Sequence, residues 1–267
     1  MVRHTLFATI AFSVLLLLSS AVRADKFASI IIDDVGNNFE YGQAVINLPA
    51  ALTISILPET IYAKNLARLA EKNNKEVMLH LPMQSVEHRK RSPGTLGLHM
   101  TKNEFKSQLQ TSLNSVPYVR GVNNHMGSLL TRHPGHMDWL MDELSKRGDL
   151  YFIDSKTTNK SIASKIAVEY DIPNLSRDFF LDPDKSKGTI RLQFNRFINR
   201  VNKRGYALAI AHPYPSTIKF LKDHLKELDD HGIKLLPVSK LISTASQLAN
   251  KRGNNYVACT STACSRL

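Results

Sequence analysis

The stretch ASIIIDDVGNN, residues 28–38, places two adjacent carboxylates directly after an apolar run. Ile30, Ile31 and Ile32 form the short apolar run that is typical of a strand buried on both faces. Asp33 and Asp34 follow where that strand leaves the core. Neighbouring residues of a strand point to opposite sides, so we expect the two carboxylates to have different tasks. The stretch therefore predicts a buried strand that ends in a polar site.

Short β-rich runs of the same kind recur along the chain and alternate with amphipathic segments. This alternation predicts parallel strands joined by crossover helices. Eight strand candidates predict an α/β fold with a single (β/α) barrel, distorted and with seven or eight parallel strands. The candidates are residues 27–32, 53–58, 76–81, 120–126, 150–154, 174–180, 206–212 and 233–238.

Helix signals lie between these strands. Apolar spacing, a Thr-to-Glu capping box and glycine stops predict helices over residues 61–73, from Thr101, up to Gly148, and from a Ser or Thr cap near residue 216 to Gly232. Longer loops are expected at residues 84–100 and 156–175.

The two ends of the chain differ in composition from the middle. Residues 1–24 have a basic start, a short apolar centre and small residues at Val22 and Ala24, the pattern of a cleaved secretory signal. An uncleaved anchor is the lesser alternative, because the apolar centre is shorter than the roughly 20 residues of a spanning helix. We predict a barrel domain over residues 25–245 and a polar tail over residues 246–267, in a periplasmic or secreted protein.

The charge of the chain favours anionic partners. The formal net charge is +12, and about +10 once the predicted signal is removed. A basic exported protein suits an anionic envelope surface, whereas no basic run with interleaved aromatics predicts nucleic acid. No second apolar segment of spanning length follows the signal. Cys259 and Cys264 are expected to form a local disulfide, and their spacing resembles half a zinc site without a second pair.

Polar side chains gather late in the predicted strands. Parallel strands of a barrel finish on one face, where active sites of this architecture lie. Each residue alone has an ordinary explanation, such as a helix cap or a core histidine, but six strands contribute together. The residues are Asp33, Asp34, His80, Asn123, Asn124, His125, Asp154, Arg177, Asp178 and His212.

Two of these histidines are suited to a metal. His80 and His125, together with one carboxylate, form a two-histidine, one-carboxylate set for zinc or a similar divalent ion. The second carboxylate is then available as a base toward water. We therefore interpret one of Asp33 and Asp34 as a metal ligand and the other as a proton acceptor.

Seven ordered motifs at these residues resemble the divergent polysaccharide deacetylase family. They are IIIDDVGNN, EVMLHLPMQ, RGVNNHMGSLLT, YFIDSKTT, RDFFLDP, ALAIAHPYPSTI and LLPVSKL, and they span residues 28–241. The resemblance implies a glycoside hydrolase/deacetylase type barrel. It also implies that Asp33 is the catalytic base, Asp34 a metal ligand and His212 the general acid, with Asp154 orienting an imidazole or fixing the charge of the site.

The chain departs from the wider superfamily at one ligand. Ordinary members carry a second histidine four residues after the first, whereas here Gln84 stands four residues after His80. His125 is our candidate for the replacement, and otherwise the metal is weak or absent. The remaining histidines considered, which are poorer candidates in loops or at helix starts, are His88, His99, His133 and His136.

The leading interpretation is an exported, metal-dependent hydrolase that removes acetyl groups from an envelope carbohydrate. Asn123 and Asn124 are expected to bind the sugar or a developing oxyanion, or to support the site. Arg177 is expected either to bind an anionic substituent or to form an ion pair with Asp178 or Asp182.

Two other interpretations stay open. The lost second histidine favours a catalytically inactive barrel that binds a glycan or an envelope protein. A glycosidase would use Asp33 with Asp154 or Asp178 as its pair of carboxylates, and that interpretation gives His80 and His125 no task.

Overall fold

The computed structural model describes residues 25–87 and 92–251. The predicted signal segment, Cys259 and Cys264 lie outside the described residues. The elements, in chain order, are β1 (Lys26–Val35), α1 (Phe39–Ile46), β2 (Thr53–Ile56), α2 (Ala63–Lys72), β3 (Glu76–Met83), α3 (Lys102–Ser115), β4 (Val119–Met126), η1 (Leu130–Arg132), α4 (Pro134–Arg147), β5 (Tyr151–Asp154), α5 (Ala163–Glu169), β6 (Asn174–Ser176), β7 (Phe179–Phe180), α6 (Lys187–Arg204), β8 (Tyr206–Ala211), α7 (Pro215–His224), α8 (Glu227–Asp230), β9 (Ile233–Leu235) and α9 (Val238–Lys251).

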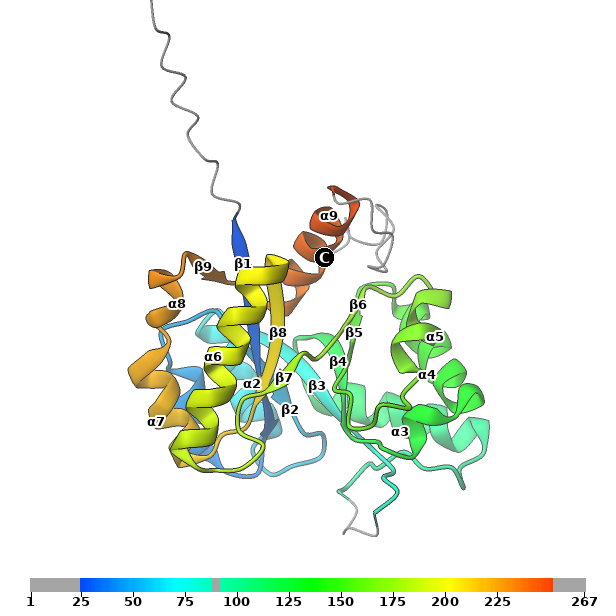
Figure 1. Cartoon of the computed structure of the whole chain (residues 1–267). Coiled ribbons are helices and arrows are strands. Elements are labelled where there is room, and N and C mark those ends of the chain that lie inside the picture. Colours follow the sequence, from blue (N-terminus) through cyan, green and yellow to red (C-terminus); the bar gives the residue numbers. More distant parts are fainter. Residues whose placement is uncertain (1–24, 88–91, 252–267) are drawn as a thin grey trace, which may run out of the picture.

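The strands of the described residues form one curled, parallel sheet. Their order is β6-β5-β4-β3-β2-β1-β8-β7, and β9 pairs with the beginning of β1. Helices α3, α4 and α5 cover one flank and α6, α7 and α8 the other (Figure 1). The predicted class, a single distorted (β/α) barrel, is confirmed. No helix in the described ranges is long and apolar enough to span a membrane.

Successive residues along a strand belong alternately to two separate apolar clusters. In β1, Ile30 and Ile32 pack outward among helix residues, in the larger cluster. Ile31 packs inward, in a smaller cluster that fills the barrel. The other inward members from the strands are Met78, Tyr151, Ile153, Leu208 and Ile210. Both faces of the strands are therefore buried, which is why these runs are almost wholly apolar.

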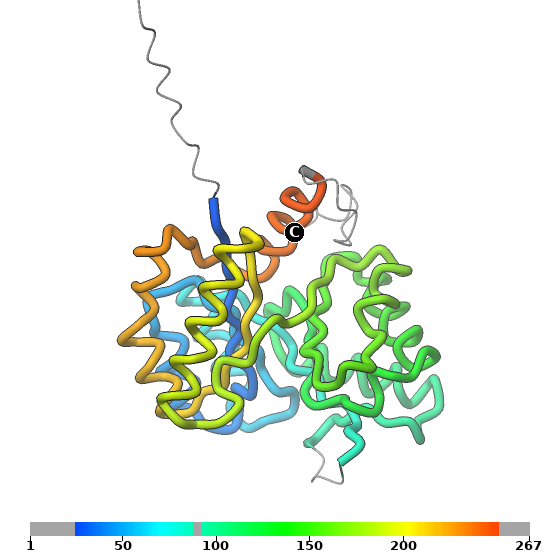
Figure 2. The backbone as a smooth tube through the Cα atoms, viewed as in Figure 1, coloured from blue at the N-terminus to red at the C-terminus, as the bar shows by residue number. Residues whose placement is uncertain are grey.

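Helix α9 covers the end of the barrel where the strands begin (Figure 2). Its residues Val238, Leu241 and Ile242 belong to the inner cluster. The first strand residues cap the helix, because Val238 N donates to Thr53 Oγ1 at 3.1 Å and Ser239 N donates to Glu76 Oε1 at 3.2 Å. The predicted domain boundary at residue 245 falls inside α9, so the start of the predicted polar tail is helical.

The barrel is interrupted on one side, and we call this break the seam. The sixth predicted strand, residues 174–180, is split into β6, which pairs with β5, and β7, which pairs with β8. The chain crosses the seam between them. Arg177 N donates to Asp154 O at 3.0 Å, and Asp178 N donates to Leu208 O at 2.9 Å. A single strand cannot pair with both edges here, so the prediction of one continuous strand is wrong.

Several predicted helix signals are confirmed. Thr101 and Glu104 form the predicted capping box at the start of α3, and α4 ends on Gly148 in the left-handed conformation. The predicted Ser or Thr cap near residue 216 is wrong, because α7 begins at Pro215 after Tyr214. The expected loop over residues 156–175 contains α5. The sequence signals predict no helix at α1, α6 or α9.

We expect a Gly121→Ala substitution to destabilise the fold. A Cβ at Gly121 would overlap the ring of Tyr151, which is fully buried and donates a hydrogen bond to Glu76 Oε1 at 2.8 Å. Such overpacking costs about 1–3 kcal/mol of unfolding free energy. Denaturant unfolding measures the change. The matched control is Gly135→Ala in α4, where nothing lies within 4 Å of the added Cβ. Equal stability of the two variants would contradict this packing.

Candidate functional site

The end of β1 brings both carboxylates of the opening stretch to one imidazole. Asp34 has a φ of 57°, in the left-handed region that few non-glycine residues adopt. The pairing of β1 with β2 shifts register between Ile32 and Val35 at the same place. His80 Nε2 consequently lies 3.6 Å from Asp33 Oδ2 and 3.1 Å from Asp34 Oδ1. The expectation that the two carboxylates face opposite sides is wrong, since the irregular backbone at Asp34 redirects its side chain.

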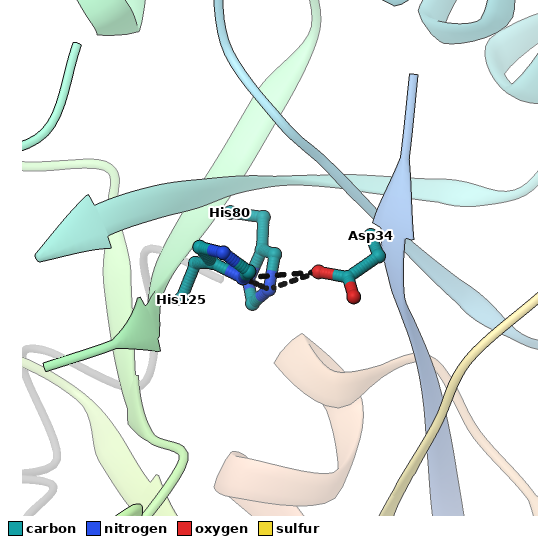
Figure 3. A group of neighbouring side chains, drawn as sticks. All are labelled: Asp34, His80 and His125. Atoms are coloured by element: carbon teal, nitrogen blue, oxygen red, sulfur yellow. Dashed lines mark hydrogen bonds and ion pairs between the residues drawn. The ribbon is translucent and has the colours of Figure 1, made fainter. Parts of the chain in front are cut away.

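His80 and His125 complete a compact group with Asp34 (Figure 3). The imidazoles come from β3 and β4, whose parallel register sets Pro82 opposite His125. His125 Nδ1 lies 3.0 Å from Asp34 Oδ1 and 3.1 Å from His80 Nε2. Three atoms that can each offer an electron pair therefore converge from three strands.

Asn123 fixes the orientation of this group. Its Nδ2 donates to Asp33 Oδ1 at 2.8 Å, and its Oδ1 accepts a hydrogen bond from Ser55 Oγ at 2.7 Å. The carboxylate and hydroxyl partners settle which end of the amide is oxygen. His80 Nδ1, 2.8 Å from Asn123 Oδ1, must then be the donor. The other nitrogen, Nε2, faces Asp34 and His125 with its electron pair whenever the ring is neutral.

The electrostatics of the group favour a positive charge at its centre. Burial raises the pKa of Asp34, but the adjacent imidazoles of His125 and His80 outweigh it and hold that pKa far below its usual range. Burial lowers the pKa of His80, yet the carboxylates of Asp33 and Asp34 prevail and raise it. Both shifts indicate that a cation, whether a proton or a metal ion, stabilises this arrangement.

The donor set fits a divalent metal ion. Two imidazole nitrogens and one carboxylate oxygen are ligands of zinc and related ions and leave positions for water or substrate. Asp34 Oδ1 is buried and has no aligned hydrogen bond within residues 25–87 and 92–251, although two ring nitrogens are close to it. An ion held by all three atoms would satisfy this oxygen.

Gln84 occupies the sequence position of the missing second histidine and forms hydrogen bonds with loop residues. Its Oε1 accepts a hydrogen bond from Leu98 N at 2.8 Å, and its backbone bonds to Leu96 and Leu130. The second histidine of the group is therefore His125, which lies beside Asp34 and His80.

His212 is held by a carboxylate that the sequence did not assign to it. Asp182 Oδ1 lies 2.9 Å from His212 Nδ1, while Asp182 Oδ2 accepts from His212 N at 2.8 Å and from Thr217 Oγ1 at 2.7 Å. Asp182 is 3 % exposed. Burial lowers the pKa of His212, but this hydrogen bond and charge dominate and raise the pKa to about 9.

Two aromatic rings stack beside His212. Phe180 stacks at 5.8 Å between ring centroids and Tyr214 at 5.5 Å, with interplanar angles of 30° and 27°. These contacts and the bond to Asp182 fix the imidazole in one orientation. A protonated ring is stabilised further by neighbouring aromatic faces.

Arg177 forms neither of the predicted ion pairs. Its Nε donates to Ser155 O at 2.7 Å and its Nη2 to Lys156 O at 2.9 Å, while its guanidinium lies 3.6 Å from the ring centroid of Phe180. Asp178 pairs with arginines of α6 instead. Burial lowers the pKa of Arg177, and the charges of Asp154 and Asp33 act against that decrease.

Asn124 and Asp154 hold loops in place. Asn124 Nδ2 donates to Met126 O at 2.7 Å and its Oδ1 accepts from Ser155 N at 2.9 Å. Asp154 accepts from Lys156 N at 2.8 Å and from Ser161 Oγ at 2.7 Å. Asn124 and Asp154 thus bind neighbouring loops, and the side chain that contacts the imidazole of His80 is Asn123.

The remaining predicted histidines do not join the centre. His133 and His136 lie in a ring cluster with Phe105 and Trp139 on α3 and α4, and His99 is exposed in a loop. His88 lies outside the described residues.

The fold and the site together define the class of the chain: a parallel (β/α) barrel with a candidate metal site near the carboxyl ends of its strands. Residues 30–242 match the family model described as divergent polysaccharide deacetylase. The chain belongs to this family, which confirms the resemblance seen in its motifs.

Known relatives agree with this assignment. The chain is 35 % identical over 234 residues to the uncharacterized protein YibQ of Escherichia coli K12, covering 88 % of this chain and 72 % of that one. It is 36 % identical over 232 residues to an uncharacterized protein of Haemophilus influenzae Rd, covering 87 % and 82 %. A crystal structure of an uncharacterized protein from Agrobacterium tumefaciens C58 shares the fold, with a TM-score of 0.78 at 20 % identity over 83 % of this chain and 91 % of that one.

We expect Asp182→Asn to lower the pKa of His212 from about 9 toward its usual value, because burial is then opposed by the charges of Asp33 and Asp34 alone. In the parent, the stabilisation from this pair is fully present below about 6.5 and is lost as the pH rises through about 9. Titration of the His212 ring resonance by NMR measures both midpoints. Thr217→Val keeps the carboxylate and is the control, with a smaller shift. An unchanged midpoint in Asp182→Asn would contradict the assigned pairing.

Proposed function

We propose that this protein is an exported, zinc-dependent deacetylase that removes acetyl groups from an envelope carbohydrate. Membership of the divergent polysaccharide deacetylase family supports a carbohydrate substrate. The convergence of Asp34 Oδ1, His80 Nε2 and His125 Nδ1 within 3.0–3.1 Å of one another is the observation that carries the proposal.

Asp34, His80 and His125 are the proposed ligands. When bound, a divalent ion supplies Lewis acidity toward an acetyl carbonyl and lowers the pKa of water. Metal binding requires neutral imidazoles, so the proton that His80 favours in its absence is released.

Asp33 is the proposed base. Its Oδ1 already accepts from Asn123 Nδ2, so Oδ2, on the side of His80, remains to accept a proton from attacking water. The side chain is 3 % exposed and is held beside the centre by a buried amide. Asn123 therefore connects the base, through one amide group, to the imidazole of His80.

His212 is the proposed acid. Its Nδ1 is occupied by Asp182, which leaves Nε2 to donate a proton to the departing nitrogen or oxygen. A pKa raised to about 9 keeps the imidazolium populated at neutral pH. The base lies near the end of β1, and the acid follows the neighbouring strand β8.

The glycosidase interpretation loses support from the contacts of its second carboxylate. Asp178 is bound by Arg200 and Arg204, and Asp154 is occupied by the loop after β5. The inactive binding module stays as the competitor, because Gln84 serves a loop where a second histidine ligand is expected. Metal content and turnover separate it from the enzyme.

Export and location rest on residues 1–24. A secretory signal would deliver the basic chain to the envelope, where its net charge suits an anionic surface. Sequencing the amino terminus of protein recovered from the periplasm tests this, with cleavage near Ala24 as the expected result and an intact leader as the contrary one.

The two aspartates should separate binding from catalysis. We expect Asp34→Ala to abolish zinc binding, because the charged ligand is lost, and Asp33→Asn to keep zinc while turnover falls by about 10²–10⁴. Calorimetry with zinc and acetate release from N-acetylated and O-acetylated glycans measure the two effects. If both variants hold zinc as the parent does, the division of roles is wrong.

The histidines should behave as a pair. Elemental mass spectrometry of the purified protein should find about one zinc per chain, strongly reduced in His80→Ala and in His125→Ala. His99→Ala, a change at an exposed loop histidine, is the matched control and should keep the metal. Absence of metal in the parent after zinc is supplied would favour the binding module.

A further inference from the structure

A cavity, which we call the seam cavity, lies at the seam between α5 and α6. Its volume is about 770 Å³, within the range of pockets that hold small ligands. Residues of α5, β6, α6 and β8 line it, with Leu175, Tyr206 and Leu208 as apolar members. The proposed reaction uses none of these apolar residues.

Positive charge is in excess around this cavity. Lys156 and Lys165 line one wall, and Arg200 and Arg204 line the other. The lysines are exposed and form no ion pair within the described residues 25–87 and 92–251. Asp178 and Glu169 are the acidic members of the lining, so the cations outnumber them even after Asp178 is paired.

The arginines are held in position before any ligand arrives. Arg204 Nε donates to Tyr206 O at 2.9 Å, and its guanidinium lies 4.1 Å from the centroid of the Tyr206 ring. Arg200 lies 5.5 Å from the centroid of the Phe179 ring. Both pair with Asp178. Side chains that are already ordered lose less conformational entropy when an anion binds.

The cavity adjoins the proposed active centre. Arg177 lines it and also contacts Phe180, which stacks on His212. Lys156 follows β5 at the same end of the sheet as Asp33. A chain-like substrate that reaches His212 can therefore continue along the seam.

A peptide strand is the poorer fit for this cavity. The edge of β8 is already occupied, because Leu208 N donates to Asp178 Oδ2 at 2.9 Å and Tyr206 O accepts from Arg204. An added strand would have to displace both side chains. A saccharide needs only an apolar floor for its ring faces and cations for its anionic groups.

We propose that the seam cavity binds an acidic saccharide segment of the substrate, whose carboxylates are held by Lys156 and Lys165. The proposal rests on the proposed function for the carbohydrate class and adds the requirement for negative charge. The substrate is thus an acetylated acidic glycan that is bound at the seam and loses an acetyl group, as acetate, beside His212.

The test compares hexagalacturonate with neutral chitohexaose by titration calorimetry in about 0.02 M salt, where exposed charges are weakly screened. The parent should bind hexagalacturonate at least about tenfold more tightly. The variant Lys156→Glu/Lys165→Glu should lose about tenfold or more. Lys64→Glu/Lys72→Glu, on exposed positions of α2, makes the same change of net charge and should lose less than about threefold.

Three outcomes would overturn the inference: equal binding of the two hexamers, equal losses in the two double variants, or tighter binding of a glutamate peptide of matched charge. Asp33→Asn, which should be inactive, is expected to bind hexagalacturonate as the parent does. Binding that depends on the seam lysines without acetate release from any acetylated glycan would refute the proposed function alone. Acetate release without seam-dependent binding would refute this inference alone.

Discussion

Asp34, His80 and His125 bring three atoms with electron pairs to within 3.1 Å of one another, and a cation is needed to hold them there. Much of the surrounding structure supports this contact. Asn123 sets the ring of His80, and the left-handed backbone at Asp34 turns a second carboxylate toward the same ring. Such a backbone costs about 1–3 kcal/mol and persists only where its surroundings enforce it.

The site is assembled from both sides of the seam. Asp34, His80 and His125 belong to β1, β3 and β4. His212 follows β8 and is held by Asp182, which follows β7. Strand β7 pairs with β8, and the chain reaches β7 by crossing the seam at Arg177 and Asp178. This crossing therefore positions Asp182, which orients the proposed acid, His212. The interruption of the barrel thus positions the proposed acid, His212, and also forms the seam cavity.

Much of the fold was predictable from apolar runs, since each of the eight runs contains a strand. The split of residues 174–180 was not, because pairing partners are set by tertiary structure. In the site, strand alternation explains the outcome: Asn123 and His125 both contact His80, while Asn124, between them, binds a loop. The irregular pairing at Asp34 breaks the same rule. Asp182 was considered only as a partner of Arg177, because its actual partner, His212, is 30 residues away in sequence.

The most direct test of the account is X-ray absorption at the zinc edge of the zinc-loaded protein. Two imidazole nitrogens and light oxygen donors, with the imidazole contribution halved in His125→Ala, are the predicted result. Sulfur in the first shell would place the zinc at Cys259 and Cys264, and an unchanged spectrum in His125→Ala would remove that histidine from the centre. Either result would contradict the site described for this family member.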